Sequence, residues 1–229
     1  MPEAPWLKKR PACIRAVDCY VRDGMTVGLG TGNAANMAVD RIAELVKGEY
    51  RLTLVSSSVQ TEEYARKLGL VITDLSDVEM VDVTIDGADE VSPDLTLIKG
   101  LGGALLKEKI LASMTEKEVI VVDDFKLVDT LGVKTPLPVE VCRFAAPRTA
   151  EKLRALGCEP VLRIKDNNPF ITDEGHVIYD CKFPSIDDPA GLEKAINTIP
   201  GVVECGLFIG MTFSVMAYSE QGGVRELHP

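Results

Sequence analysis

The sequence is poor in positive charge and in histidine. Its 229 residues include 25 lysines and arginines against 35 aspartates and glutamates, so the net charge is −10. A nucleic-acid-binding protein needs a basic face to displace counterions from phosphates, and this balance argues against that class. With only His176 and His228, and with no CxxC pair among the cysteines, a zinc site of the usual spacing is not expected.

Long apolar runs are also missing. None approaches the ~18 residues that a membrane-spanning helix needs, and the stretch MPEAPWLKKRPAC has no apolar core of the kind found in signal peptides. We therefore expect a cytoplasmic protein with no membrane partner. Six cysteines are expected to be reduced thiols there: Cys13, Cys19, Cys142, Cys158, Cys181 and Cys205.

Short apolar runs alternate with helical patterns in the first half of the chain. Strands are predicted at 25–29, 52–55, 81–85 and 119–122, and helices at 34–46, 60–68 and 103–114. This alternation is typical of a parallel sheet covered by helices. The fold class predicted is α/β, with a Rossmann-like parallel sheet domain and a second, smaller α+β domain.

The pattern changes after Gly132. The run KTPLPVEV has Pro136 and Pro138, which suit a linker or an edge strand. Helices are predicted at 147–156 and 189–198, and extended segments at 160–164 and 202–209. We expect a Rossmann-like catalytic domain formed by 1–134 plus 206–229, and a small α+β domain formed by 135–205.

A glycine-rich turn in VGLGTGNAANMAV, residues 27–39, follows the first predicted strand and precedes a helix. Such a turn directs backbone N–H groups inward, and the helix N-terminus adds partial positive charge, so the turn suits a phosphate group. It lacks the third glycine of the dinucleotide motif G-x-G-x-x-G and the lysine of a P-loop. The alternative is a tight strand-to-helix turn with Asn33 as the helix N-cap.

Two further loops after predicted strands carry polar side chains. Three serines precede a helix: Ser56, Ser57 and Ser58. One serine is enough to cap the helix, so a run of three also favours the binding of a ligand by their hydroxyl groups. Asp86 and Asp89 follow the next strand, where two carboxylates can move protons, grip sugar hydroxyls or bind a divalent metal. The alternative for the two acids is a solvated turn.

The segment LIKGLGGALLKEKILASM places Lys99 before a glycine-rich turn and Glu108 on the helix that follows. Ala104 and Ala112 lie one turn before and after Glu108 and leave room for a ligand. Because apolar residues such as Ile110 cover most of the remaining surface, the helix is expected to be buried, and a buried carboxylate suits proton transfer. The alternative is a surface ion pair between Glu108 and a neighbouring lysine.

All of these groups are predicted to follow strands of one parallel sheet, whose loops share one edge. Lys126, in VVDDFKLVDTLG, follows the strand at 119–122 and is a candidate for the same cleft, an ordinary solvated lysine being the alternative. An anionic ligand of this acidic protein needs local positive charge. The candidates are the N–H groups of the glycine-rich turn, Lys99, Lys126, Lys8, Lys9 and Arg10.

The segments GLGTGNAA, SSSVQTEE, DGADEV, LIKGLGGALLKEKI, DDFKLVDTLG, PLPVEV and IPGVVECGLF occur in this order along the chain. The sequence thereby resembles the type A ribose-5-phosphate isomerases over nearly its whole length. The resemblance implies interconversion of D-ribose 5-phosphate and D-ribulose 5-phosphate in the pentose phosphate pathway, with no metal and no other cofactor. It also implies a homo-oligomer, either a dimer or a tetramer.

The resemblance assigns the catalytic roles to Glu108, Asp86 and Lys99. Glu108 falls on the base, and Lys99 on the lysine beside the reacting oxygens. The substrate-binding residues that it implies are Thr31, Gly32, Asn33, Ala34, Ser56, Ser57, Asp86, Gly87, Ala88, Asp89, Lys99, Gly100, Leu101, Gly102 and Lys126.

Two departures from the family pattern concern the binding loops. The family usually has GTGST where this chain has Asn33 and Ala34 after Gly32, so two hydroxyls that would face the phosphate are replaced. It also favours KGGG, which Leu101 interrupts here. The first change predicts weaker phosphate binding, and the second raises the question of local backbone shape and substrate preference.

The chemistry of aldose–ketose isomerisation suits these residues. We expect Glu108 to take the proton from C2 and return it to C1, and Lys99 to stabilise the enediolate. Asp86 would move protons on the two oxygens and assist ring opening, while Asp89 would orient hydroxyls. The alternatives are a non-catalytic sugar-phosphate sensor on the same scaffold and a metal-dependent enzyme that uses Asp86 and Asp89.

Overall fold

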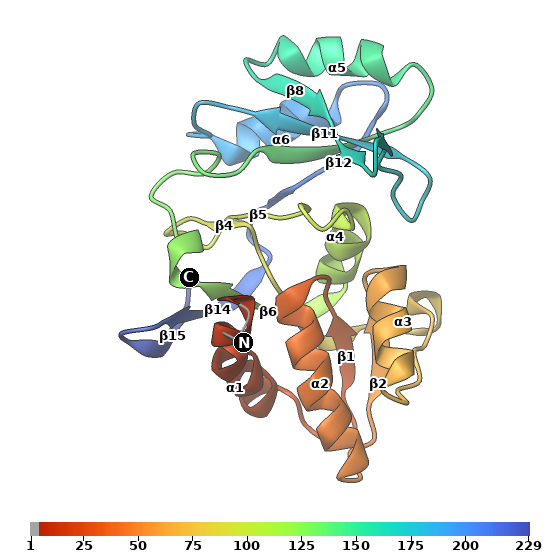
Figure 1. Cartoon of the computed structure of the whole chain (residues 1–229), viewed down its shortest axis with the longest axis vertical. Coiled ribbons are helices and arrows are strands. Elements are labelled where there is room, and N and C mark those ends of the chain that lie inside the picture. Colours follow the sequence, from red (N-terminus) through yellow and green to blue (C-terminus); the bar gives the residue numbers. More distant parts are fainter. Residues whose placement is uncertain (1–4) are drawn as a thin grey trace. The chain divides into compact units, whose positions relative to one another are not determined.

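The computed structural model describes residues 5–229 of the chain (Figure 1). These residues group into two compact units. The first contains the chain up to Ala88, Lys107–Lys126 and Met211–Pro229, and the second contains Asp89–Leu106 and Leu127–Gly210. The predicted smaller domain, 135–205, falls inside the second unit, which also takes in Asp89–Leu106. The division into domains at 134 and 206 stays a prediction.

The first unit is built on a six-stranded sheet in the order β15-β14-β6-β3-β1-β2. Its strands are β1 (Thr26–Leu29), β2 (Thr53–Ser56), β3 (Val81–Asp86), β6 (Thr115–Asp123), β14 (Thr212–Ser219) and β15 (Gly223–Leu227). Neighbours from β14 to β2 pair in parallel, and β15 pairs antiparallel with β14. The mostly parallel sheet confirms the predicted α/β class.

Helices accompany this sheet, and their apolar spacing explains why they form. They are α1 (Arg10–Tyr20), α2 (Asn33–Lys47), α3 (Val59–Lys67) and α4 (Leu105–Ser113), with the 3-10 turns η1 (Pro5–Lys9), η2 (Leu75–Asp77) and η3 (Asp124–Lys126). On α2, buried Met37, Ile42 and neighbouring alanines recur at helical spacing. Helix α1 buries Ala12, Cys13, Ala16 and Val17, a face of small residues for which the sequence pattern predicted no element.

The second unit contains small sheets and two helices. A four-stranded antiparallel sheet has the order β12-β7-β11-β8, a three-stranded sheet the order β13-β5-β4, and β10 pairs with β9. The elements are β4 (Glu90–Val91), β5 (Leu97–Ile98), β7 (Leu137–Val141), α5 (Ala146–Arg154), β8 (Glu159–Leu162), β9 (Ile164–Lys165), β10 (Asn168–Pro169), β11 (Val177–Lys182), α6 (Pro189–Asn197), β12 (Val202–Cys205) and β13 (Leu207–Phe208).

The interpretation of KTPLPVEV as a linker or an edge strand is wrong, because β7 is an interior strand between β12 and β11. Pro138 pairs with Asp180 of β11. On its other side β12 ends at Cys205, opposite Val139, and the carbonyl of Pro138 accepts the N–H of Gly206 at 2.8 Å. The strand uses the acceptor that proline keeps, so the missing N–H does not confine this proline to an edge.

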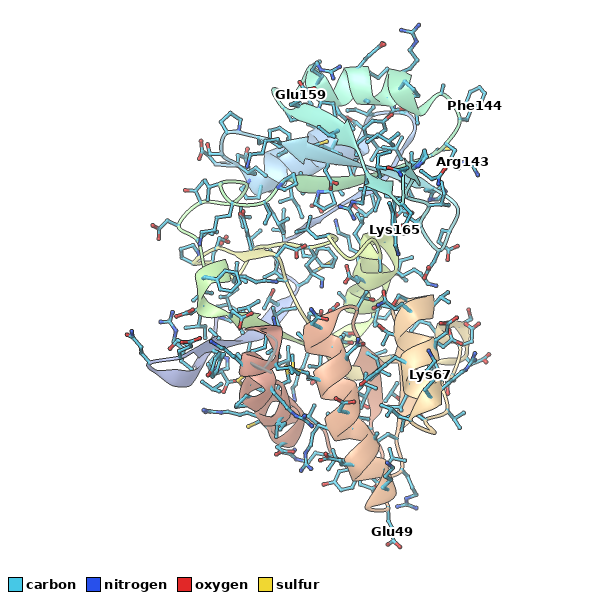
Figure 2. All side chains as sticks on the ribbon, viewed as in Figure 1. Glu49, Lys67, Arg143, Phe144, Glu159 and Lys165 are labelled. Atoms are coloured by element: carbon cyan, nitrogen blue, oxygen red, sulfur yellow. The ribbon has the colours of Figure 1, made fainter. Side chains whose placement is uncertain are left out.

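Apolar side chains fill a core in each unit (Figure 2). The labelled Phe144 is an exception, since it is 88% exposed. All six cysteines carry free thiols, and burial raises the pKa of Cys13 to about 12, which keeps that thiol protonated at neutral pH. Among the helices within residues 5–229, none has the length and apolar character that crossing a membrane requires.

A buried carboxylate that the sequence did not reveal organises one loop of the second unit. Glu90 has no exposed surface and accepts backbone N–H groups from Gly132, Lys134 and Thr135, and the hydroxyl of Thr135 as well. The two N–H bonds from Gly132 and Lys134 are both 2.7 Å long. A buried ion requires such a complete set of donors, which is why the loop closes around it.

We expect Glu90→Gln to lower the free energy of unfolding by about 1–3 kcal/mol, because an amide replaces a charged acceptor and brings a donor next to N–H groups. Urea denaturation measures the change. The matched control is Glu151→Gln, whose exposed pair with Arg148 predicts a change below about 0.5 kcal/mol. Equal stability of Glu90→Gln and wild type would contradict this role for Glu90.

Candidate functional site

The carboxyl ends of four neighbouring strands lie at one edge of the six-stranded sheet. Strands β1, β2, β3 and β6 run parallel, and they end at Leu29, Ser56, Asp86 and Asp123. The loops that follow them carry the glycine-rich turn, the serines, the DGA segment and Lys126. Parallel pairing thus brings together the predicted groups that belong to the first unit.

The carboxylate of Asp86 joins two of these loops. Its Oδ1 accepts the backbone N–H of Thr31 at 3.0 Å and that of Gly87 at 2.6 Å. Gly30, in turn, donates its N–H to the carbonyl of Ile85 at 3.1 Å. Asp86 is only 1% exposed, so the carboxylate is held in one orientation at the end of β3. The alternative of a solvated acidic turn does not describe Asp86.

Hydroxyl groups connect the glycine-rich turn to the serine loop. Thr31 Oγ1 shares a hydrogen bond of 2.9 Å with Ser57 Oγ and donates to Ser58 Oγ at 2.8 Å. Ser58 caps α3 by accepting the N–H of Thr61, as the capping interpretation of one serine predicts. Ser56 Oγ donates to the carbonyl of Ser58 at 2.9 Å. Binding of substrate by Ser56 and Ser57 stays a prediction.

Helix α2 begins differently from the capped turn that was the alternative interpretation of this segment. The N-cap position belongs to Gly32, at φ +101°, and no side chain accepts a hydrogen bond there, so the interpretation of Asn33 as N-cap is wrong. Glycine takes this left-handed backbone conformation without strain. The first N–H groups of a helix have no partner within the helix, so the segment from Asn33 presents donors and the positive end of the helix dipole. A Cβ on Gly87 would lie 3.5 Å from Ala34 Cβ, which places these two predicted binding residues next to each other.

Three lysines of the first unit, Lys8, Lys9 and Lys126, are paired with acids or with a carbonyl. Lys126 donates from Nζ to the carbonyl of Ala88. Lys9 is buried and forms an ion pair of 2.8 Å with Asp123, while Lys8 pairs with Glu220. Lys8 and Lys9 therefore pair with carboxylates of this unit, which departs from their expected role of compensating an anionic ligand.

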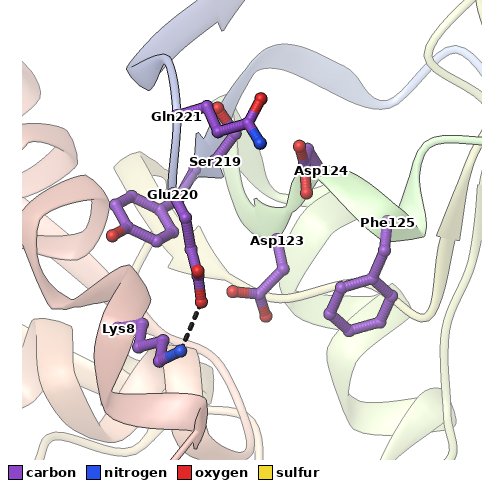
Figure 3. Close-up of a pocket in the computed structure, with 8 residues that line it drawn as sticks. Lys8, Asp123, Asp124, Phe125, Ser219, Glu220 and Gln221 are labelled. Atoms are coloured by element: carbon purple, nitrogen blue, oxygen red, sulfur yellow. Dashed lines mark hydrogen bonds and ion pairs between the residues drawn. The ribbon is translucent and has the colours of Figure 1, made fainter.

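A cavity of about 450 Å³ lies beyond the ends of β6 and β14 in the same unit (Figure 3). It is lined by Lys8, Asp123, Asp124, Phe125, Tyr218, Ser219, Glu220 and Gln221. Figure 3 shows the ion pair of Lys8 and Glu220 within this lining.

Glu108 lies on α4, in the part of the helix that belongs to the first unit. It is 5% exposed, so the alternative of a surface carboxylate is wrong. Ala104 and Ala112 are buried as well, as their spacing from Glu108 predicts. Ile110 was expected to help bury the helix but is 46% exposed, because it lies on the face of α4 opposite to that covered by its buried neighbours.

The second unit holds the remaining predicted residues around a short loop. Lys99 follows β5, which belongs to the antiparallel sheet β13-β5-β4, so the expectation that all five groups follow strands of one parallel sheet is wrong for Lys99. Its side chain is 2% exposed, and Nζ lies 5.3 Å from the centre of the Phe208 ring. Asp89 Oδ2 accepts the N–H of Leu101 at 3.0 Å. The structure thus groups Asp89, Lys99 and the loop at 100–102.

The positive φ angles of this loop fall on glycines. Gly100 has φ +106° and Gly103 has φ +87°, and both are conformations that side chains other than glycine rarely adopt. Leu101 and Gly102 lie between them in a turn. Leucine at position 101 therefore replaces neither of the two glycines whose backbone conformation requires glycine. Its side chain is 43% exposed.

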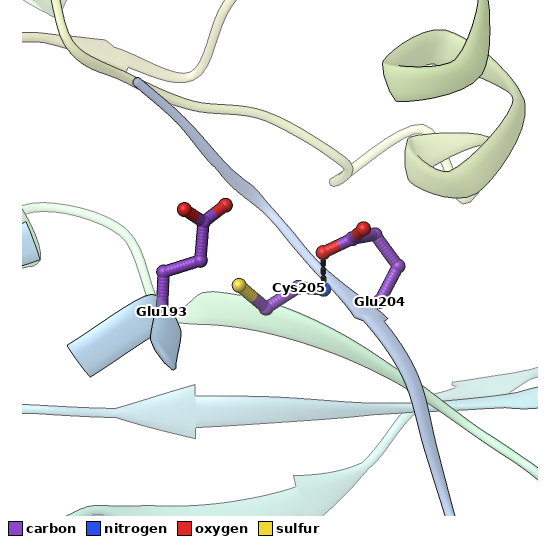
Figure 4. A group of neighbouring side chains, drawn as sticks. All are labelled: Glu193, Glu204 and Cys205. Carbon is purple, nitrogen blue, oxygen red and sulfur yellow. Dashed lines mark hydrogen bonds between the residues drawn. The ribbon is translucent and has the colours of Figure 1, made fainter. Parts of the chain in front are cut away.

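Among the described residues 5–229, one group of possible metal ligands lies in the second unit (Figure 4). Its members are Glu193, Glu204 and Cys205, whose ligand atoms lie within 4.8 Å of one another. Glu204 Oε1 already accepts the N–H of Cys205 at 2.8 Å. No spacing in the sequence pointed to this trio, because tertiary packing brings Glu193 to the other two.

The chain is similar to known proteins over nearly its whole length. The family model of ribose 5-phosphate isomerase A (phosphoriboisomerase A) matches residues 53–222. A curated ribose-5-phosphate isomerase A of Gloeobacter violaceus is 49% identical over 96% of each chain. Among solved structures, the ribose 5-phosphate isomerase of Plasmodium falciparum has a TM-score of 0.94 at 35% identity, covering 98% of this chain and 99% of that one. A D-ribose-5-phosphate isomerase in complex with phospho-erythronic acid has a TM-score of 0.93 at 38% identity, covering 97% and 98%.

The close approach of Gly30 to Asp86 provides a test of the first unit's loop arrangement. A Cβ on Gly30 would lie 2.1 Å from both Cγ and Oδ1 of Asp86. We expect Gly30→Ala to displace this carboxylate and to lower the free energy of unfolding by about 1–3 kcal/mol, measured by urea denaturation.

Gly48→Ala is the matched control, because Gly48 has φ −85° and the nearest atom to its added Cβ lies 3.3 Å away. A loss no larger in Gly30→Ala than in Gly48→Ala would show that Asp86 is not held as described.

Proposed function

The chain belongs to the ribose 5-phosphate isomerase A family, and we propose that it interconverts D-ribose 5-phosphate and D-ribulose 5-phosphate in the non-oxidative pentose phosphate pathway. The observation that carries this function is similarity to a curated isomerase over 96% of its length, at 49% identity. The intramolecular transfer that such an isomerase performs needs a base, a group that stabilises an enediolate, and a site for phosphate.

Glu108 is the proposed base. It removes the proton from C2 of the open-chain aldose, while the electrons of that C–H bond form the C1–C2 double bond and the C1 carbonyl oxygen becomes negatively charged. The same carboxyl group then returns the proton to C1, and the ketone forms at C2. Burial of Glu108 supports this role, because a carboxylate that is 5% exposed is shielded from bulk water and held in one place on α4.

Lys99 is proposed to stabilise the negative charge of the enediolate, and Asp86 to move the protons on O1 and O2 and to assist ring opening. The buried position of Lys99 supports an electrostatic role, since charge interactions are stronger away from water. Asp89 is proposed to orient hydroxyls of the sugar. The two N–H bonds that Asp86 accepts support a fixed position for its carboxylate.

The phosphate is proposed to bind at the glycine-rich turn and the start of α2, through Thr31, Gly32, Asn33 and Ala34. Backbone N–H groups and the helix dipole provide the attraction, so the loss of two hydroxyls relative to the family pattern weakens the site without removing it. Ser56, Ser57, Gly87, Ala88 and Lys126 are proposed to complete the binding residues of the first unit. Gly100, Leu101 and Gly102 are proposed to bind substrate in the second.

Two alternatives make different predictions about turnover. A non-catalytic sugar-phosphate sensor would bind the substrate without converting it, and the presence of the whole proposed set of acid, base and lysine argues against it. The metal-dependent alternative uses Asp86 and Asp89. Their oxygens accept N–H groups of Thr31, Gly87 and Leu101. We therefore propose that the two carboxylates act as proton carriers and hydrogen-bond acceptors without a metal. We also propose a cytoplasmic dimer or tetramer.

We expect Glu108→Gln to keep the fold and to bind phospho-erythronic acid, the ligand held by one solved relative, while kcat falls by about 10²–10⁴-fold because the general base is lost. Formation of ribulose 5-phosphate measures kcat, and calorimetric titration measures binding. Glu116→Gln, an exposed acid on β6, is the control and keeps the wild-type rate. A near wild-type rate in Glu108→Gln would remove Glu108 from the mechanism.

Metal removal separates the mechanism from its metal-dependent alternative. After dialysis against EDTA and then against metal-free buffer, the protein is expected to isomerise ribose 5-phosphate at the untreated rate. The rate is measured before and after treatment, and after addition of Mg²⁺ or Mn²⁺. Loss of activity that these ions restore would favour the alternative in which Asp86 and Asp89 hold a metal.

A further inference from the structure

Arg163, for which the sequence suggested no role, contacts the loop at 100–102 of the second unit. Its Nη1 donates to the carbonyl of Gly100 at 2.8 Å and to that of Leu101 at 3.1 Å. Two successive carbonyls of the proposed substrate-binding loop therefore point at one guanidinium group. A planar guanidinium with five N–H donors in fixed directions can hold both at once.

The guanidinium is itself held on its other side. Nε donates to Asp180 Oδ2 at 2.9 Å, and Nη2 donates to Asp180 Oδ1, so the pair has the two-pronged geometry of strong arginine–carboxylate contacts. Arg163 is 12% and Asp180 is 22% exposed in their side chains. Asp180 lies in the middle of β11, between β7 and β8, which makes it a rigid anchor.

Phe170 adds a packing contact to the same arrangement. The centre of its ring lies 5.9 Å from the Arg163 guanidinium carbon. Its edge lies against Gly103, where an added Cβ would come within 2.3 Å of the ring. Arg163 and Phe170 thus constrain the loop at both ends, from Gly100 to Gly103.

The contacts of Arg163 with the two carbonyls also determine the direction of the N–H groups in the same peptides. In a planar trans peptide, the carbonyl of one residue and the N–H of the next point in opposite directions. With the Gly100 carbonyl on Arg163, the N–H of Leu101 points away from the guanidinium, and it meets Asp89 Oδ2 at 3.0 Å. With the Leu101 carbonyl on Arg163, the N–H of Gly102 must also point away.

We propose that Arg163 is a positioning residue that aims the N–H of Gly102 at an oxygen of the reacting sugar. This inference rests on the proposed function, in which the loop at 100–102 binds substrate. Arg163 does not touch the substrate; it fixes the two peptide planes before the substrate arrives. A donor held in place in advance stabilises the charge that develops on oxygen without reorganising during the reaction.

The test compares Arg163→Gln and Arg163→Lys with the control Arg154→Gln, whose exposed pair with Glu159 lies in the same unit. For Arg163→Gln we expect kcat to fall by about 10-fold to 10²-fold with KM changed by less than about threefold, since a donor misplaced by ~1 Å costs that much in rate. Faster hydrogen exchange of the Leu101 amide, whose N–H is held by Asp89, is expected in the same variant. Arg163→Lys should recover part of the rate, because one ammonium group reaches a carbonyl but does not hold both the loop and Asp180. Arg154→Gln should match wild type in both measurements.

A second variant covers the case in which Arg163→Gln fails to fold. Asp180→Asn leaves the arginine in place and weakens its anchor, so it should show the same changes in kcat and in amide exchange, smaller in size. The inference is overturned if the Leu101 amide exchanges as in wild type, or if it exchanges faster with kcat unchanged. Absence of isomerase activity in the wild type refutes the proposed function instead, and the amide exchange still decides whether Arg163 holds the loop.

Discussion

The loops of the first unit depend on the carboxylate at the end of β3. Asp86 accepts N–H groups from both Thr31 and Gly87, and it lies against Gly30 so closely that no Cβ fits between them. A single buried acid thereby sets the shape of the glycine-rich turn after β1 and of its own loop. Asp86 is only 1% exposed, and these N–H groups supply the hydrogen bonds that a buried carboxylate needs. The start of α2, where phosphate binding is proposed, takes its place from this arrangement.

In the second unit the same principle operates with a cation. Arg163 gathers the carbonyls of Gly100 and Leu101, while Asp89 accepts the Leu101 N–H on the other side of the peptide. The glycines at positive φ allow the chain to turn between these two charges. In each unit, a charged side chain that lies outside the irregular segment, or at its edge, holds that segment by hydrogen bonds. Such an arrangement suits loops that must keep one geometry when a ligand binds.

The prediction of helices and strands succeeded where the apolar periodicity is strong. It failed where contacts with a segment distant in sequence determine the local structure. The alternating run at Val81–Asp86 and the helical spacing of α2 led to the correct elements. Pro138 indicated an edge strand by its own chemistry, but Gly206 supplies an N–H to its carbonyl, so the strand is interior. The alternative for the glycine-rich turn had Asn33 as the N-cap of α2, yet the chain reaches the helix through a left-handed Gly32. Lys99 was assigned to the parallel sheet because nothing in its own segment reveals that β5 pairs with β4 and β13.

The sequence by itself determined the family, the parallel α/β class, and the residue types proposed for catalysis, because these follow from motifs and from periods of two and 3.6 residues along the chain. Tertiary structure decided which polar groups serve the protein and which are available for chemistry. Lys9 proved to be the partner of Asp123, Glu90 the centre of a loop, and Arg163 the support of the glycine segment. The physical reason is that a buried charge is tolerated only with a specific partner, and partners 42 to 114 residues apart leave no periodic trace in the sequence.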